Sequence, residues 1–388
     1  MSKNVRFKKQ TTGSFFGSFL YEQVIPRNHF LVKAKEIIDW EVFSRKLLKW
    51  YRISESKGGG NLPYDPALLL RILFLSYLYN ISERQIEERV TFDLTFKYFV
   101  GLGVDEKAPD HSTLTYFKER LLLGGGKSAF DELLREILKQ AQNKGIQFGS
   151  IQIIDATHTI ADVNTDKDKQ RKKGGKRDKD GNPKPPASPR DPDAAWGVKH
   201  VKEVKNIETG KIEKQKECFH GFKSHTSMNA ASDLITSIVT TPGNETDGKQ
   251  FIKVANKDNR VKGLDRHRTY ASDKASDDGD IHEYLKEKKY GNAVKLKKTR
   301  TAQIWQELKD DPKHRDGVKE RYKVERKFGE EKQGHGLKRC RYLGLTKYHA
   351  QTVMTALAVN LKVVVAFMTG STLKGYAYAG NCVWSDST

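Results

Sequence analysis

The sequence predicts an α/β fold, with an all-helical N-terminal domain followed by a domain built on a sheet with flanking helices. Before residue 145 the apolar residues form helical segments that begin at capping residues, whereas from residue 148 short β-branched runs alternate with helical segments. The chain of 388 residues also exceeds the ~250–300 at which a single hydrophobic core stops growing. We therefore expect domains at 1–145 and 146–368, and a tail at 369–388.

Helix start signals define the N-terminal domain. Asp65 is placed as an N-cap with Pro66 at the first helical position, and apolar residues then surround the predicted helix. Ser82 and Gln85 have the spacing of a capping box, and Asp110 begins a further capped helix. Short turns between such helices resemble a helix-turn-helix, although ordinary packed helix pairs share this pattern.

The charge of the chain indicates a polyanionic partner. Lys and Arg number 70 against 49 Asp and Glu, which gives a formal net charge of +21 and a pI near 9.6. Nucleic acid is the simplest such partner, and a merely soluble basic protein is the alternative. Residues 164–190 concentrate this charge without apolar periodicity, so we expect a flexible basic insertion, either solvated or contacting nucleic acid.

Several other classes are disfavoured. Cys218, Cys340 and Cys382 form no CxxC pair, so neither a disulfide framework nor a zinc ribbon is supported and a reducing cytosol fits. The N-terminus lacks the apolar core of a signal peptide, and the apolar run 352–368 contains Asn360 and Lys362. We expect that run to be a buried helix and expect no membrane association. Glycine-rich phosphate loops are absent from the sequence, which disfavours nucleotide binding.

Three acidic residues in the C-terminal half lie where a phosphoryl-transfer site needs carboxylates. Asp155 ends an apolar strand-like run, Asp273 follows another, and Glu325 lies on a basic amphipathic helix predicted over 318–332. Divalent Mg²⁺ prefers oxygen ligands, and two such ions ~3.5–4 Å apart activate the nucleophile and stabilise the leaving group. Neighbouring strands would bring these carboxylates together.

Each acid also has an ordinary interpretation. Asp155 has the position of a turn residue, and the helix carrying Glu325 has the composition of a solvated helix. Asp273 is one of three nearby aspartates that could supply the second carboxylate. Position alone does not choose among Asp273, Asp277 and Asp278.

The order of these segments resembles a known family. The spacing of Arg321, Glu325 and Lys332 is similar to the last three members of the Tyr-Arg-Glu-Lys signature of DDE transposases from bacterial insertion sequences. The segments around Asp155 and Asp273 resemble those around that family's two catalytic aspartates. Upstream segments at 64–70, 81–89, 99–102 and 109–114 are similar to the N-terminal domain of the "IS-five" group.

Two departures from the family pattern are visible. Val318 occupies the Tyr position of the signature, a position that supports DNA positioning in relatives, and Ala275-Ser276 replaces the Gly-Tyr that often follows the second aspartate. These departures bear on whether this copy is active more than on which residues would carry the chemistry.

The resemblance implies a ribonuclease H-like mixed five-stranded sheet, with flanking helices and a preceding all-α domain. It implies a transposase that cuts the ends of an insertion sequence and joins them to target DNA by two-metal phosphoryl transfer, using Mg²⁺ with Mn²⁺ as a substitute. The metal ligands would be Asp155, Asp273 and Glu325. Lys223 and His225 are candidates that would face the same groove, with a packed or solvated role as the alternative. The expected DNA contacts are Arg321, Lys332, Lys223, His225, Arg84, Arg89 and Lys118.

The implied partners are double-stranded DNA, in the form of terminal inverted repeats and target, and further copies of the chain in a homodimer or larger assembly. The implied location is the bacterial cytoplasm, at the nucleoid. Two alternatives are a metal-dependent nuclease that cuts without joining, and a DNA-binding protein whose catalysis has decayed.

Overall fold

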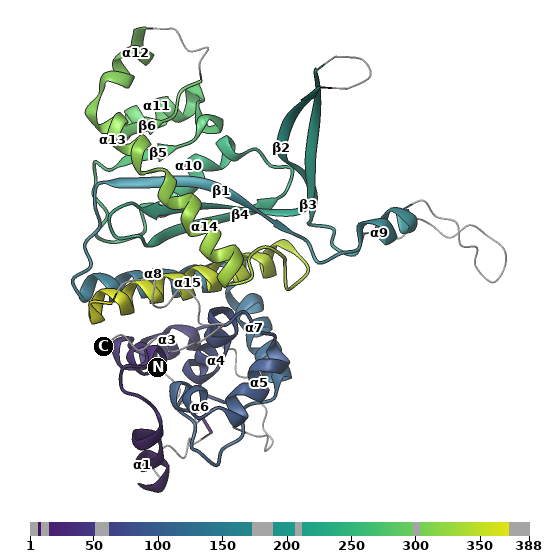
Figure 1. The fold of residues 1–388 in the computed structure, drawn as a ribbon, viewed down its shortest axis with the longest axis vertical. Helices are drawn as coiled ribbons and strands as arrows, with labels where there is room; N and C mark the ends of the chain where they lie inside the picture. The colour runs from purple at the N-terminus through teal and green to yellow at the C-terminus, as the bar shows by residue number, and fades with distance from the viewer. Residues whose placement is uncertain are drawn as a thin grey trace, which may run out of the picture.

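The computed structural model describes residues 7–8, 15–50, 62–172, 189–205, 212–297 and 303–371. Within these residues the chain forms a helical N-terminal half and a six-stranded mixed sheet with helices on both faces (Figure 1). The helices that precede the sheet are α1 (Phe15–Val24), α2 (Phe30–Ile37), α3 (Trp40–Leu48), α4 (Pro66–Leu78), α5 (Glu83–Phe92), α6 (Leu94–Val100), α7 (His111–Gly125) and α8 (Lys127–Asn143).

The predicted helix starts are confirmed. The Asp65 carboxylate accepts a hydrogen bond from the Ala67 backbone N–H at 2.7 Å, and Pro66 begins α4. Ser82 and Gln85 form both bonds of the capping box at the start of α5. Asp110 caps α7 by accepting from the Ser112 N–H at 2.7 Å.

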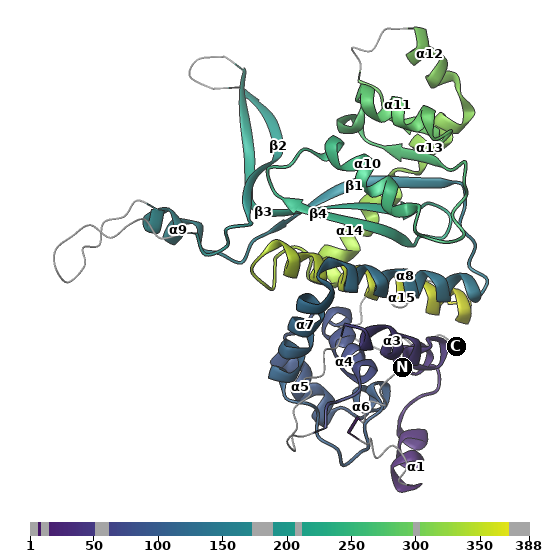
Figure 2. The same cartoon turned by 180° about the vertical axis from the view of Figure 1, so that it is seen from behind.

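The helix α15 (Leu345–Thr369) joins the two halves of the molecule. It is long and apolar enough to span a membrane, yet 83% of its most apolar window is buried inside the protein, as expected for a core helix. With α8 it forms a layer between the sheet and the N-terminal helices (Figures 1 and 2). One hydrophobic cluster contains Leu70 of α4, Leu134 of α8, Ile238 of the sheet and Leu357 of α15. The two predicted domains therefore share a core.

The sheet contains one strand more than the five expected. Its strands are β1 (Ile151–Ile160), β2 (Ala195–Lys205), β3 (Ile212–Asn229), β4 (Ile235–Pro242), β5 (Thr269–Ser272) and β6 (Gly291–Val294). The order is β2-β3-β1-β5-β6, with β4 also paired to β3. Because β3 has 18 residues, its first half pairs with β2 and its second half with β4. The lysine-rich β2 lacks the alternation that signals a strand, which is why the sequence did not predict it.

The predicted basic insertion is only partly described. Its first residues form a helix, α9 (Thr165–Lys172), where a flexible loop was expected. Residues 173–188 of the insertion lie outside the described residues, as does the tail from residue 372 onwards.

Side chains of β1 alternate between two apolar layers. Ile154 packs with α10 (Asp247–Asp258) and α11 (Gly279–Glu287), and Ile153 packs with α14 (Tyr322–Gly334) on the other face. Figure 1 shows α14 crossing one face, and Figure 2 shows α10 on the other. The remaining helices are the short η1 (Lys274–Ser276), α12 (Gln303–Asp310) and α13 (Pro312–Glu320).

The predicted helix over 318–332 is interrupted at Arg321, where α13 ends and α14 begins. Gly317 permits the close approach of α13 to the sheet, because a Cβ atom there would lie 2.3 Å from the Ala293 Cβ. The interruption lets α13 cover β5 and β6 while α14 crosses β1.

A buried carboxylate fixes the sheet to α10. Asp258 is fully buried, and its oxygens accept hydrogen bonds from Ser227 at 2.7 Å and from Thr236 and Ser237 at 2.8 Å. The Tyr270 hydroxyl donates a further bond at 3.2 Å. Burial raises the pKa of Asp258, while the three Ser and Thr hydroxyls and Arg268 oppose that rise. These bonds hold β3, β4 and β5 in register beside one helix.

We expect Asp258→Ala to lower the free energy of unfolding by about 3 kcal/mol, because it leaves several buried hydroxyls without an acceptor. The exposed Asp316, which forms only an i,i+3 ion pair with Lys319, is the matched control, and its replacement by Ala should change the free energy by less than about 0.5 kcal/mol. Urea denaturation followed by circular dichroism measures both. Equal shifts for the two variants would contradict the role given to Asp258.

Candidate active site

The register of β1 and β5 places two aspartates side by side. Ile153 and Ala271 are paired across these parallel strands, and both belong to the apolar layer beneath α14. Side chains return to the same face every second residue, so Asp155 and Asp273 follow on that face, on strands about 4.8 Å apart. Each aspartate is therefore the first residue on this face after the apolar layer.

Helix α14 brings the third carboxylate to this face. Val324 and Phe328 anchor α14 in the same apolar layer, and Glu325 lies beside them on the exposed side. Arg321 spans two of the carboxylates: its Nη1 is 3.6 Å from Asp155 Oδ2, and its Nη2 is 2.7 Å from Glu325 Oε1. Two acids that are 170 residues apart in the sequence thus share one guanidinium.

The electrostatics of Asp155 reflect this crowding. Its side chain is 18% exposed, and its Oδ1 accepts a hydrogen bond from the Ala156 N–H at 2.8 Å. Burial, together with the negative charges of Asp273 and Glu325, raises the pKa of Asp155 to about 7, against the opposing effects of the Ala156 N–H and Arg321. The three acids therefore interact electrostatically, and a cation among them would relieve their repulsion.

The structure also distinguishes the three aspartates that follow β5. Asp277 is buried, with its oxygens bonded to His282 at 2.8 Å and to the Lys297 N–H at 2.7 Å. Asp278 caps α11. Asp273 caps η1 with one oxygen and is the aspartate whose charge acts on Asp155.

Lys332 lies two turns beyond Glu325 on α14, among further positive charges. Burial lowers its pKa, and Lys199 of β2 and Lys338 lower it further, while Glu331 acts in the opposite sense. Sequence reasoning missed the approach of Lys199 and Lys338 to Lys332, because the three lysines come from separate segments. The result is a basic region at the end of the helix that carries Glu325.

Two family models match the chain over these parts. The model described as "Transposase DDE domain" matches residues 146–361, more than half of the chain, and "Transposase domain (DUF772)" matches residues 19–120. The chain belongs to the DDE transposase family. The sheet, α14 and the three acids all lie within the larger match.

Two solved structures are distantly similar to this DDE transposase. A piggyBac transposase synaptic complex with hairpin DNA has 9% identity and a TM-score of 0.42, with 90% of this chain and 79% of that chain covered. A pre-cleavage Mos1 transpososome has 11% identity and a TM-score of 0.21, with 81% and 82% covered. Similarities this low carry no argument about the site.

The expectation that Lys223 and His225 face the same groove as Asp155 is wrong. Asp155 pairs with Thr226 across β1 and β3, and Ala156 pairs with His225, so His225 and Lys223 lie on the opposite face. There Lys223 Nζ is 2.9 Å from Asp247 Oδ1, and His225 Nε2 is 2.9 Å from the Thr241 hydroxyl. Burial lowers the pKa of His225 to about 4. A register change of one residue reverses the face, and the sequence pattern alone did not indicate which face of β3 carries Lys223 and His225.

In the N-terminal half of the DDE transposase, Arg84 and Arg89 are exposed on α5, as a DNA contact requires. Lys118 is 8% exposed, and it forms an ion pair with Glu83 and a 3.0 Å hydrogen bond to the Tyr342 hydroxyl. The expectation that Lys118 binds a DNA phosphate is therefore corrected, because its ammonium group is already paired with Glu83 and Tyr342.

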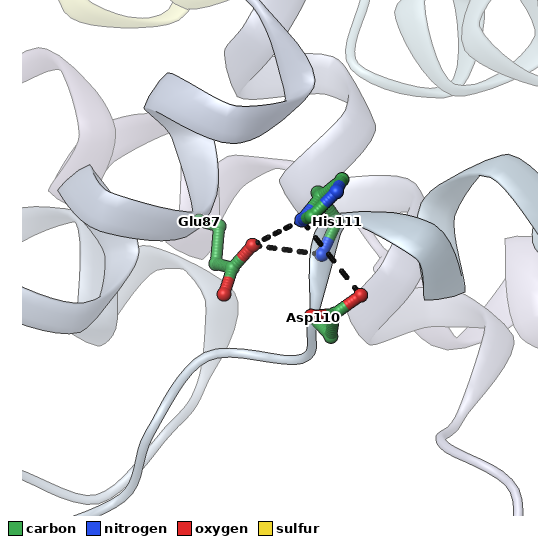
Figure 3. A group of neighbouring side chains, drawn as sticks. All are labelled: Glu87, Asp110 and His111. Carbon is green, nitrogen blue, oxygen red and sulfur yellow. Dashed lines mark hydrogen bonds and ion pairs between the residues drawn. The ribbon is translucent and has the colours of Figure 1, made fainter.

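A second group of potential ligands lies at the start of α7 (Figure 3). Among the described residues, only Glu87, Asp110 and His111 place one ligand atom each within 4.8 Å of one another, so the oxygens of the three site acids are more widely spaced than that. Glu87 Oε2 lies 2.9 Å from the His111 backbone N and 2.8 Å from its Nδ1, and Asp110 caps the helix. These contacts satisfy a helix N-terminus, and we assign no ion to them.

The raised pKa of Asp155 predicts a stability cost. Because the pKa rises from 3.8 to about 7 on folding, the folded state binds the extra proton between these values, and stability falls as pH increases through this range. Without divalent ions, Asp155→Asn should therefore stabilise the protein at pH 8 by roughly 1–3 kcal/mol, with a smaller gain at pH 5. Thermal unfolding in EDTA measures the difference. A gain that does not change with pH, or no gain, would contradict the electrostatic account, and Asp316→Asn is the exposed control.

Proposed function

We propose that this protein is a DNA transposase that cuts the ends of an insertion sequence and joins them to target DNA. One observation carries the proposal: Asp155, Asp273 and Glu325 lie on one face of the sheet, and Arg321 contacts Asp155 and Glu325, in a chain of the DDE transposase family. Phosphoryl transfer is the chemistry that such a set of carboxylates supports. The membership of the "IS-five"-like group is part of the same proposal.

The sheet supports a ribonuclease H-like core for this function. Without β2, its strands run in the order β4-β3-β1-β5-β6, with β3 antiparallel to β1 and β4, and with β5 parallel to β1 and β6. We place the catalytic domain at 146–368 and the DNA-binding domain at 1–145.

The residues of the site fit divalent cations. They supply carboxylate oxygens, which Mg²⁺ and Mn²⁺ prefer, and the repulsion at Asp155 favours binding of positive charge. Arg321 already takes a cation's place between Asp155 and Glu325. Asp155, Asp273 and Glu325 would be the residues that hold these ions. When bound, such ions activate an oxygen nucleophile and stabilise charge on the phosphoryl oxygens.

The protein's own residues would prepare the DNA for attack. Asp155 has to lose its proton to act as a ligand, so cleavage at limiting Mg²⁺ should increase with pH through about 7. The planar guanidinium of Arg321, which lies between Asp155 and Glu325, would bind a phosphate beside these acids by two parallel hydrogen bonds. Lys332, with Lys199 and Lys338 nearby, would bind the DNA backbone two helical turns beyond Glu325 on α14.

The substrate we propose is double-stranded DNA carrying terminal inverted repeats, at the nucleoid of a bacterial cytoplasm. A net charge of +21 and the exposed Arg84 and Arg89 support binding by the N-terminal helices. Joining two ends requires both in one complex, so we propose a homodimer or larger assembly on DNA.

Replacing the site acids tests the chemistry. Asp155→Asn, Asp273→Asn and Glu325→Gln should each reduce Mg²⁺-dependent cleavage and joining of labelled element ends by at least about 10³-fold, because each removes a carboxylate that would hold the ions that stabilise the transition state. Lys223→Gln is the matched control, since Lys223 lies on the opposite face, and it should retain activity within about threefold.

The products separate the alternatives. Cut ends without joined product would favour a nuclease, and inactivity of the unmodified protein with intact DNA binding would favour a decayed DNA-binding protein. Unchanged cleavage in Asp155→Asn would refute the proposed site.

The N-terminal contacts have a separate test. Arg84→Gln with Arg89→Gln should weaken DNA binding and reduce the slope of log K against log salt by about 0.9 for each phosphate that the variant no longer neutralises. Fluorescence anisotropy with a duplex of the element end, at several salt concentrations, measures this. Lys139→Gln on the exposed side of α8 is the control, and an equal slope for both proteins would exclude α5 from the interface.

A further inference from the structure

A chain of ion pairs that includes two buried lysines holds the helix that carries Glu325. Lys327 is 1% exposed, and its ammonium group is 2.7 Å from Asp233 Oδ2 and 3.5 Å from Glu330 Oε2. The other oxygen of Glu330 is 2.6 Å from the ammonium of Lys362, which is 2% exposed on α15. Helix α14 is thereby connected to the β3–β4 turn on one side and to α15 on the other.

The chain continues into the N-terminal half through His335. Its Nδ1 is 3.1 Å from the carbonyl oxygen of Tyr77 in α4, so this nitrogen donates. Its Nε2, 3.4 Å from the Lys362 ammonium, then accepts, which requires a neutral ring. Burial, with the adjacent Lys362, lowers the pKa of His335 to about 4, consistent with this tautomer.

At the other end of this chain of ion pairs, basic residues of α14 contact the β3–β4 turn. Asp233 has a φ of +59°, a left-handed conformation that few non-glycine residues adopt. It accepts from Lys327 and, at 3.3 Å, from Arg326, and Lys323 donates to the Ala230 carbonyl at 2.9 Å. Three basic residues of α14, all within five positions of Glu325, thus contact one turn.

Stability alone does not explain this network. Replacing buried ion pairs by apolar residues of similar volume is often neutral or stabilising, whereas charged partners fix one arrangement of the elements that carry them. Burial favours the protonated form of Glu330, but Lys327 and Lys362 lower its pKa below the ordinary value, so the pairing is ionic. The helix it fixes is the one whose position sets the distance from Glu325 to Asp155.

We propose that Lys327, Glu330, Lys362 and His335 are positioning residues that set Glu325 against Asp155 and link that position to the N-terminal helices. The inference rests on the proposed function in one respect, namely that Glu325 is a metal ligand. The four residues touch neither metal nor DNA in this role and act through the placement of α14.

Manganese binding and hydrogen exchange of α14 test the proposal in the full-length protein. Lys327→Met should raise the Mn²⁺ concentration for half-saturation by about 10-fold, as is usual for loss of a group that orients a ligand. It should also speed amide exchange across residues 321–334. Lys327→Arg, which keeps the charge, should retain most of both properties.

A second variant and a matched network provide the controls. His335→Leu breaks the contacts with Tyr77 and Lys362 and should change exchange and Mn²⁺ binding in the same direction. Asp131→Asn disturbs another buried network, in which Asp131 contacts His349 at 3.0 Å and Lys257 at 2.7 Å. It should lower thermal stability without changing Mn²⁺ affinity or α14 exchange.

The outcomes distinguish this inference from the proposed function. If Lys327→Met and His335→Leu lose thermal stability as Asp131→Asn does but keep Mn²⁺ affinity and α14 protection, the positioning role is refuted. If the unmodified protein binds Mn²⁺ but neither cuts nor joins DNA, the proposed function fails, while faster α14 exchange and weaker Mn²⁺ binding in the variants still support the positioning role. If it binds no Mn²⁺, the link to Glu325 as a ligand is refuted.

Discussion

The gathering of Asp155, Asp273 and Glu325 on one face of the sheet is the constraint on which the C-terminal half of this DDE transposase depends. Folding buries Asp155 near the negative charges of Asp273 and Glu325. Burial, and to a smaller extent these charges, raise the pKa of Asp155 to about 7, which reflects the free-energy cost of keeping it ionised. Arg321 offsets part of that cost by contacting two of the acids. A site arranged in this way has affinity for positive charge before any DNA arrives.

The rest of the sheet domain keeps these charges together. Asp258 receives hydroxyl donors from three strands and so fixes β5, on which the position of Asp273 depends, relative to β3 and β4. On the opposite face, Lys327 and Glu330 fix α14. Both devices depend on a buried ionisable side chain, Asp258 or Lys327, whose partners come from other elements. Such groups are costly to bury alone, so they enforce one arrangement of those elements.

The two halves of the chain are less separate than the composition of the sequence suggests. They share a hydrophobic cluster through α15, and the segment after α14 forms polar bonds with the N-terminal helices. In that segment Arg341 donates to the carbonyls of Ser76 and Ile81, and the Tyr342 hydroxyl donates to Glu83 at 2.8 Å. A movement of the N-terminal helices would therefore reach the end of α14 through these bonds. This would connect the DNA binding that we propose for these helices with the proposed site.

Features that depend on neighbours in the sequence were predictable. The caps at Asp65, Ser82 and Asp110 are local hydrogen bonds, and the burial of α15 follows from its apolar composition. The candidate acids were found from their positions after apolar runs and from the family signature, and their role as metal ligands stays a prediction. The strand β2 was missed because its lysine-rich sequence has no strand-like alternation, and its pairing depends on the length of β3.

The sequence by itself determined the family, the helix boundaries marked by capping residues and the identity of the candidate acids, because these depend on residue type and local spacing. Only the tertiary structure decided which acids meet, that Lys223 and His225 lie on the far face, and that Lys118 is used internally. These facts depend on strand register and on contacts between distant segments. A register shift of one residue exchanges the two faces of a strand while leaving every local sequence signal unchanged.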